Sequence, residues 1–188
     1  MIKTLMYTSH ARRFAATLAL AAAALAVGGC KGKHSQPAVQ NEEAQPAAQL
    51  LSSLKMNDEA APAHLLKGFY VVENNAWRWT AGSFTVLLKP PVAAAQRGGT
   101  LSLSFSVPEI SIAKLKTLTL TASIGTTKLK PETYTKPGPY TYTADVPADL
   151  LSKESVTIDF ALDHSLSPGT VDLRELGLIA TAVGLEAK

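Results

Sequence analysis

Apolar and polar side chains alternate residue by residue in four stretches of the second half of the chain. The clearest is 100–107, where Leu, Leu, Phe and Val take every second position and Ser or Thr takes the others. Residues 116–122, 140–146 and 156–162 repeat the pattern. A period of two is typical of a strand that buries one face and leaves the other in water. These stretches therefore predict half-buried antiparallel strands.

Four further segments, 69–73, 77–80, 84–88 and 178–185, bring the predicted total to about eight strands. Glycine and proline signals separate them, among them Pro90-Pro91, Gly98-Gly99, Pro137-Gly138-Pro139 and Pro168-Gly169. Short strands at regular spacing with turn signals are typical of β-sandwiches. We expect an all-β fold, with a single antiparallel β-sandwich or jelly roll over residues 64–188. About 120 residues can hold one hydrophobic core without disulfides.

The first 30 residues follow a different pattern. Lys3, Arg12 and Arg13 precede an uncharged apolar run, 14–27, and Gly28-Gly29 then leads to Cys30, the only cysteine. The run of about fourteen residues is shorter than the ~20 of a spanning helix. A charged start, an apolar stretch and small residues are typical of a secretory signal. Residues 1–29 therefore predict a signal peptide.

Gly28-Gly29-Cys30, placed after that run, resembles the lipobox of bacterial lipoproteins. The resemblance implies that the Cys30 thiol carries lipid and that the lipid bilayer is the first partner of the protein. Two or more acyl chains anchor a protein stably. The alternative is an ordinary secreted protein with one free thiol. Lys31 after the cysteine, in place of an aspartate, favours the outer membrane over the inner membrane of the cell envelope.

Residues 30–63 are rich in Ala, Gln, Pro and Glu and contain no aromatic residue. Such a composition buries too little apolar surface to offset the entropy of ordering the chain. We expect a flexible tether after the lipidated cysteine. Within it, the spacing of Leu50, Leu51 and Leu54 suits a helical turn or two, either loosely ordered or packed on the domain.

The formal net charge of +3 comes from the predicted signal peptide, because Lys3, Arg12 and Arg13 are the only charged residues before Cys30. The rest of the chain is formally neutral. No basic patch of the kind that binds nucleic acid remains. We therefore expect no nucleic-acid partner.

Both tryptophans lie in one short segment, Trp77-Arg78-Trp79. On a strand, residues two apart point to the same face. We expect Trp79 to be the better buried and to support the core, and Trp77, with Arg78, to contact a ligand such as a sugar ring. Tyr140 and Tyr142 share a strand face, which we expect to be half core, and Tyr140 is a further stacking candidate.

Asp172 and Arg174 lie beside the last apolar strand, and with Glu73 they form a candidate structural charge cluster. We expect a salt bridge that pins this strand to a neighbour. Together the signposts Gly68-Phe69-Tyr70, Glu73, Arg78-Trp79-Thr80 and Asp172-x-Arg174-Glu175-Leu176-Gly177 resemble a β-sandwich module found beside bacterial glycosyltransferases and sugar-linked methyltransferases. The resemblance implies a jelly-roll, carbohydrate-module-like accessory domain. This chain departs from that pattern, because we expect its module to be anchored by a lipid and not attached to a catalytic domain.

No catalytic motif stands out, and we expect no enzymatic activity and no cofactor. His34, His64 and His164 lack the spacing of zinc ligands, so no metal site is predicted. The sequence thus favours a membrane-anchored envelope lipoprotein whose β-sandwich binds glycan without catalysis. The alternative is a scaffold or assembly lipoprotein that binds protein partners in the envelope. Exposure of Trp77 to solvent would favour glycan binding over the scaffold role.

Overall fold

The structure is a computed structural model that describes residues 49–170 and 172–188. The predicted signal peptide, Cys30 and the first part of the predicted tether lie outside these residues. The elements, in chain order, are β1 (Ser53–Lys55), α1 (Ala61–His64), β2 (Leu65–Glu73), β3 (Trp77–Leu88), α2 (Ala94–Arg97), β4 (Gly99–Val107), α3 (Glu109–Leu115), β5 (Leu118–Ile124), β6 (Thr127–Lys128), β7 (Glu132–Tyr134), β8 (Gly138–Val146), the 3-10 helix η1 (Ala148–Leu151), β9 (Val156–Leu162) and β10 (Ile179–Ala187).

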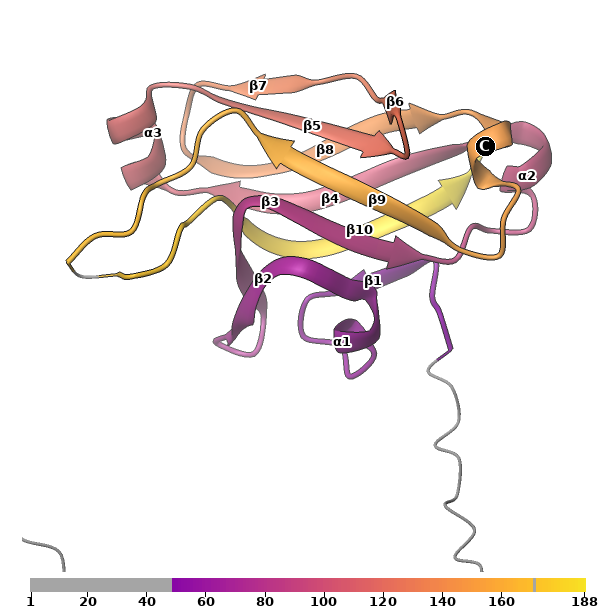
Figure 1. Ribbon diagram of the computed structural model, residues 1–188, viewed down its shortest axis with the longest axis horizontal. Coiled ribbons are helices and arrows are strands. Elements are labelled where there is room, and N and C mark those ends of the chain that lie inside the picture. The colour runs from indigo at the N-terminus through magenta and orange to yellow at the C-terminus, as the bar shows by residue number, and fades with distance from the viewer. Residues whose placement is uncertain (1–48, 171) are drawn as a thin grey trace, which may run out of the picture. The chain divides into compact units, whose positions relative to one another are not determined.

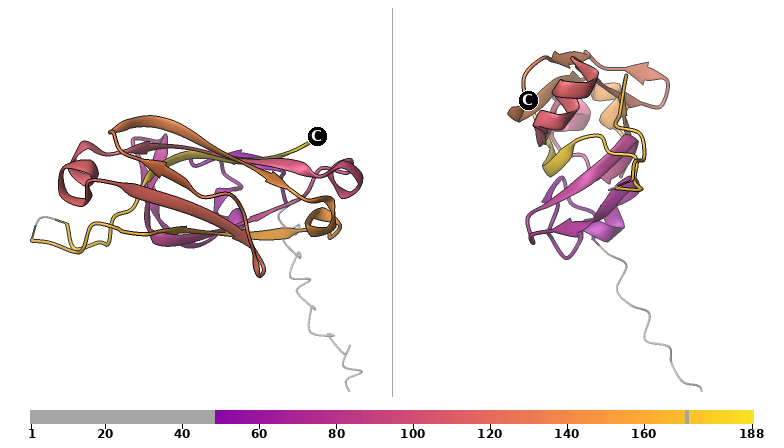
Figure 2. Two further views of the ribbon diagram at one scale, coloured as in Figure 1. Left: turned by 90° about the horizontal axis from the view of Figure 1, so that it is seen from above. Right: turned by 90° about the vertical axis from the view of Figure 1, so that its left-hand side faces the viewer.

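All the strands of the described residues belong to one antiparallel sheet. Its main path runs β6-β5-β9-β3-β10-β4-β8, and β1, β2 and β7 pair with β10, β3 and β5 (Figure 1). The strands β8 and β9 are far apart on this path, yet the ring centroids of Tyr142 on β8 and Phe160 on β9 lie only 6.4 Å apart. The sheet must therefore curl so that its two ends face each other. Two layers therefore face each other across one core, as the views in Figure 2 show. The expected all-β fold is confirmed.

The alternating pattern decides which side chains enter that core. In β4 the residues Leu101, Leu103, Phe105 and Val107 are buried, and the serines between them are half-buried on the outer face. At ~1.5–3 kcal/mol for each large apolar side chain, this burial is the main stabilising contribution. Phe84 of β3 stacks on Phe160 of β9 with ring centroids 5.0 Å apart.

Six of the eight predicted strands are present at about their predicted positions. The structure differs from the expectation in two ways. The two segments predicted at 77–80 and 84–88 form a single strand, β3, because the chain continues through Ala81 and Gly82 without turning. The additional strands β1, β6 and β7 are two or three residues long, too short to show a period in the sequence. The described part of the chain therefore has ten strands rather than about eight.

The end of the predicted tether folds with the domain, which corrects the boundary at residue 64. Leu54 and Met56 are buried in the core, and β1 pairs with β10 through Ser53–Gly184 and Lys55–Ala182. This segment is a strand and not a helical turn. The composition of the segment is misleading because two apolar side chains in it, Leu54 and Met56, are buried when β1 pairs with β10.

Successive stretches of β3 pair with β9 and with the start of β10. Ser83 pairs with Ala161 of β9, and Trp79 pairs with Ile179 of β10. Between these two points the chain makes an excursion over residues 163–177, which returns where the Thr80 N–H donates to the Leu178 carbonyl at 2.8 Å. No helix among the described residues is long and apolar enough to cross a membrane.

Candidate functional site

Small polar side chains cover the outer face of the layer that β1, β10, β4 and β8 form. Cross-strand partners point to the same side of a sheet, and the register pairs Ser102 with Gly184 and Thr143, and Ser104 with Ala182 and Thr141. Side chains of this size leave the surface low between neighbouring elements. We call this surface the hydroxyl floor: Ser53, Thr100, Ser102, Ser104, Ser106, Thr141, Thr143, Ala182 and Gly184.

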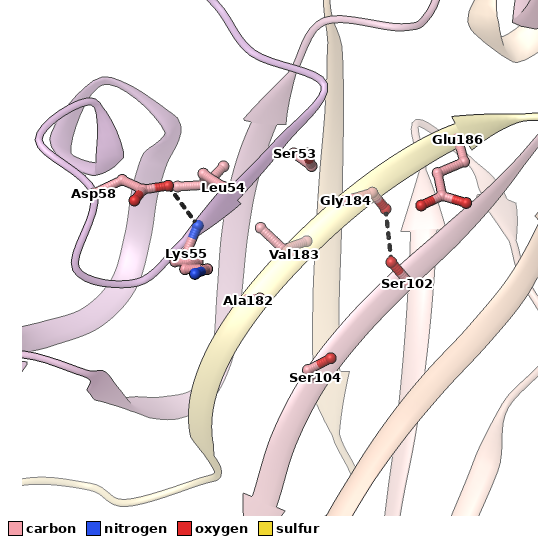
Figure 3. Close-up of a pocket in the computed structure, with 10 residues that line it drawn as sticks. All are labelled: Ser53, Leu54, Lys55, Asp58, Ser102, Ser104, Ala182, Val183, Gly184 and Glu186. Carbon is pink, nitrogen blue, oxygen red and sulfur yellow. Dashed lines mark hydrogen bonds between the residues drawn. The ribbon is translucent and has the colours of Figure 1, made fainter.

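A hollow of about 390 Å³ opens on the hydroxyl floor where β1, β10 and β4 run side by side (Figure 3). Lys55 and Asp58 border it on the β1 side, and Glu186 borders it on β10. The Asp58 carboxylate accepts the Lys55 backbone N–H at 2.7 Å, which holds this border in place. The hollow therefore combines a hydroxyl-lined base with one cation and two carboxylates at its rim.

A second hollow of about 320 Å³ adjoins the first at Ser104 and continues toward Pro139 and Thr181. The Thr181 hydroxyl donates to the Ser104 carbonyl at 3.0 Å, and the Ser104 and Thr141 hydroxyl oxygens lie 3.4 Å apart. The two hollows together form one open depression across the strands. Its hydroxyl groups can donate and accept hydrogen bonds with a polar ligand.

Both tryptophans lie on the same side of the layer as the hydroxyl floor. Trp79 pairs with Ile179, and Ile179 pairs with Ser106, whose side chain is on the floor. Trp77 is two residues away and therefore faces the same way. The two indoles meet edge to face, with centroids 6.3 Å apart. They place an aromatic surface on the same side of the layer as the depression, and neither indole lines either hollow.

Trp79 is not in the core, which corrects the expectation that it supports the core. Both tryptophans are half-buried. The inward positions of this part of β3 belong instead to Arg78, which pairs with buried Ala180, and to Thr80. Because strand residues alternate between faces, inward positions at Arg78 and Thr80 place Trp77 and Trp79 on the outer face.

Arg78, expected to contact a ligand, is held by the backbone. Its Nε donates to the Met56 carbonyl at 2.8 Å, and its Nη1 donates to the Tyr70 carbonyl at 3.0 Å. These bonds join the chain after β1 and the strand β2 to β3. Arg78 thus supports the strand that carries the tryptophans.

Tyr140, a predicted stacking residue, lines the second hollow but is not part of the hydroxyl floor. It pairs with buried Phe105, and its ring centroid lies 4.7 Å from that of Tyr134. Its hydroxyl donates to the Lys136 carbonyl at 3.1 Å. Burial raises the pKa of both Tyr134 and Tyr142 in the same part of the core. Tyr140 is half-buried at the edge of this aromatic cluster, with Tyr142 fully buried beside it.

The structure brings Glu73, Asp172 and Arg174 together. The Arg174 guanidinium lies 2.9 Å from Glu73 Oε1 and 2.8 Å from Asp172 Oδ2, and its carbon sits 5.0 Å from the centroid of the Tyr70 ring. Hydrogen bonds from Arg174 lower the pKa of Asp172 to about 2. The three side chains are about a third exposed (31–34%), so solvent screens them.

The cluster fixes the base of the 163–177 excursion. The Tyr70 hydroxyl donates to the Glu175 carbonyl at 2.7 Å, and the Ser165 hydroxyl donates to the Glu175 carboxylate at 2.6 Å. Gly177 passes so close to β3 that an added Cβ would lie 2.5 Å from the Ala81 carbonyl oxygen. The motif residues at the two ends of the domain therefore meet at one structural junction.

Sequence reasoning missed the border residues Lys55, Asp58 and Glu186 and the role of Ser102 and Ser104. The alternation marked the serines as outward-facing, but β4, β5 and β9 all have such a face, and only packing shows which face is hollowed. Lys55 and Asp58 lay in the predicted tether. Cys30 is outside the described residues. Within those residues, no group of three or more His, Cys, Asp or Glu side chains is placed to hold a metal.

Comparisons with known proteins add little to this description. No protein-family model matches the chain, and no curated protein matches it. One solved structure with similarity to the chain is described as "CBM4 structure and function". It is 15% identical, and the alignment covers 71% of this chain and 81% of that chain with a TM-score of 0.29. A likeness at this level carries no argument about function.

Proposed function

We propose that the protein is a non-catalytic glycan-binding module that binds its ligand across the hydroxyl floor. One observation carries the proposal: the tryptophan pair and the two adjoining hollows lie on the same face of one layer. Sugar rings present apolar faces that stack on indoles and hydroxyl groups that bond to serine and threonine. Ligand sites in proteins combine a concave surface and apolar or aromatic side chains with a few polar groups that orient the ligand.

The charges at the border favour a glycan without a strong net charge. Lys55 faces the first hollow from β1, and Asp58 and Glu186 face it with the opposite sign. A strongly anionic polymer would meet the two carboxylates, and a polycation would meet Lys55. Neutral or mixed-charge polysaccharide segments avoid both repulsions.

We further propose that the module is anchored to the cell envelope, with the outer membrane favoured, through lipid on Cys30. The support is the order of charge, apolar run and Gly28-Gly29-Cys30 in the sequence. The chain between Cys30 and the first described residue would then separate the module from the bilayer.

A glycan array probed with residues 31–188 tests the binding proposal, because the core begins at Leu54 and lies entirely within this piece. A hit is then measured with Ser102→Phe, which fills the first hollow, and Thr121→Phe, at a half-buried outward position of β5 in the other layer. We expect Ser102→Phe to abolish binding and Thr121→Phe to leave it unchanged. Equal loss from both, or no glycan bound by the unsubstituted domain, contradicts the proposal.

One observation favours the alternative, a scaffold for envelope proteins. β2 is an edge strand that pairs only with β3 among the described strands, and its Leu66 and Val71 are 52% and 73% exposed. Exposed apolar residues on a free edge suit strand addition by a partner. Val71→Lys would weaken the binding of a protein partner captured from the envelope and would leave glycan binding unchanged.

A further inference from the structure

His64 lies fully buried between the start of the domain and β3, and both of its ring nitrogens bond to the backbone. Nδ1 lies 2.6 Å from the Leu87 carbonyl oxygen, and Nε2 lies 3.3 Å from the Leu51 nitrogen. A carbonyl oxygen only accepts, so Nδ1 must carry the proton. Nε2 is then the acceptor for the Leu51 N–H. This pattern requires a neutral imidazole.

Protonation of His64 cannot keep this arrangement. A proton on Nε2 would point at the Leu51 N–H, and two donors would face each other in a site that water does not reach. A buried charge without a compensating partner is strongly unfavourable. Opening the contact lets the ring bind its second proton in water, so a falling pH favours the open state.

The charged residues of the surrounding elements do not relieve this conflict. They are Lys55 on β1, Asp58 and Glu59 before α1, Lys67 and Glu73 on β2, Arg78 on β3 and Lys89 directly after β3. Asp58 accepts the Lys55 N–H, Glu73 pairs with Arg174, and Arg78 donates to two carbonyls. In the described part of the chain, none of the seven forms a hydrogen bond or ion pair with the imidazole.

The segment that His64 holds is one border of the proposed glycan site. Leu51 continues into β1, whose residues Ser53, Leu54 and Lys55 line the first hollow (Figure 3). The segment is also held by its pairing with β10, by the buried side chains of Leu54 and Met56 and by the Arg78 bond to the Met56 carbonyl. Three further backbone bonds join it to its neighbours: the Lys89 N–H donates to the Leu51 carbonyl, the Leu185 N–H to the Ser52 carbonyl and the Met56 N–H to the Thr181 carbonyl. β1 itself is three residues long.

We propose that His64 is a pH-sensitive latch that holds β1 against β10 and that its protonation releases this border of the depression. The release itself needs no ligand. Its consequence for binding rests on the proposed glycan function. The latch would make the site complete at neutral pH and incomplete in acid.

Hydrogen exchange of the full-length protein in detergent tests the latch without any glycan. The reporters are the amides of Met56, Lys89 and Leu185, corrected for the intrinsic pH dependence of exchange. We expect their exchange to rise as the pH falls, by up to about tenfold for each pH unit. His64→Gln, whose amide can donate to Leu87 and accept from Leu51 without titrating, should remove the rise. His164→Gln, at the exposed histidine, should not.

The same rise in His64→Gln as in the unsubstituted protein would overturn the latch. If His64→Gln does not fold, NMR of the unsubstituted protein decides, because the His64 ring signal must titrate over the pH range in which the reporters lose protection. Loss of protection without that titration also overturns the latch. A working latch in a protein that binds no glycan would instead refute only the proposed function.

Discussion

At the scale of single residues, the two tryptophans differ from expectation in a way that changes their use. Strand alternation predicted correctly that Trp77 and Trp79 share a face. It could not predict which face, because a large aromatic residue is equally at home in a core and at a binding surface. The register of Trp79 with Ile179 and Ser106 decides it.

Replacing either indole should therefore reduce binding more than stability. For a glycan identified on the array, we expect Trp79→Ala and Trp77→Ala each to raise Kd by about tenfold or more, as for other buried aromatic anchors. Each should cost well under the ~3–5 kcal/mol of a core tryptophan. Isothermal titration and chemical denaturation measure the two effects. A core-sized loss of stability with unchanged Kd would contradict this assignment.

Asp172 provides a prediction for pH dependence. Its carboxyl has an ordinary pKa near 3.8, and hydrogen bonds from Arg174 lower the pKa to about 2 in the folded protein. A lowered pKa stabilises the fold above pH 3.8, and the contribution disappears as the pH falls through 2. We expect the Tm difference between the unsubstituted protein and Asp172→Asn to shrink between pH 4 and 2. Asp149→Asn, which changes an exposed carboxylate that forms no ion pair among the described residues, is the matched control.

At the scale of elements, long strands were predictable and short ones were not. A strand such as β4 shows its period over nine residues, whereas β1 has three residues and depends on an existing edge of β10. The sequence 49–63 carries too few apolar residues to form a core of its own. Its structure comes from tertiary pairing, which local composition cannot report.

Met56 tests whether this segment belongs to the domain. Its side chain is fully buried, whereas its neighbour Lys55 is exposed. Truncating a buried methionine costs about 2–5 kcal/mol. We expect Met56→Ala to lower the free energy of unfolding by that amount and Lys55→Ala to change it little. Urea denaturation followed by fluorescence measures both, and equal small effects would return the segment to the tether.

At the scale of the whole molecule, anchoring remains a prediction from the first 30 residues. Cys30→Ser removes the only thiol that could accept lipid. In the native host we expect the variant to lose labelling by radioactive palmitate and to leave the membrane fraction. Cys30→Ala should behave in the same way. Continued labelling of either variant would refute the lipoprotein interpretation.

The excursion over residues 163–177 has a consequence for how such a domain can grow. The chain departs beside Ser83 and rejoins at Thr80, so the strands on either side are already in place without the tip that lies beyond the Leu166–Leu176 bridge. Extra residues inserted at that tip shift no strand register and uncover no core. This is the point at which evolution can lengthen the chain, or an engineer can splice in a second domain, while the sandwich is inherited unchanged.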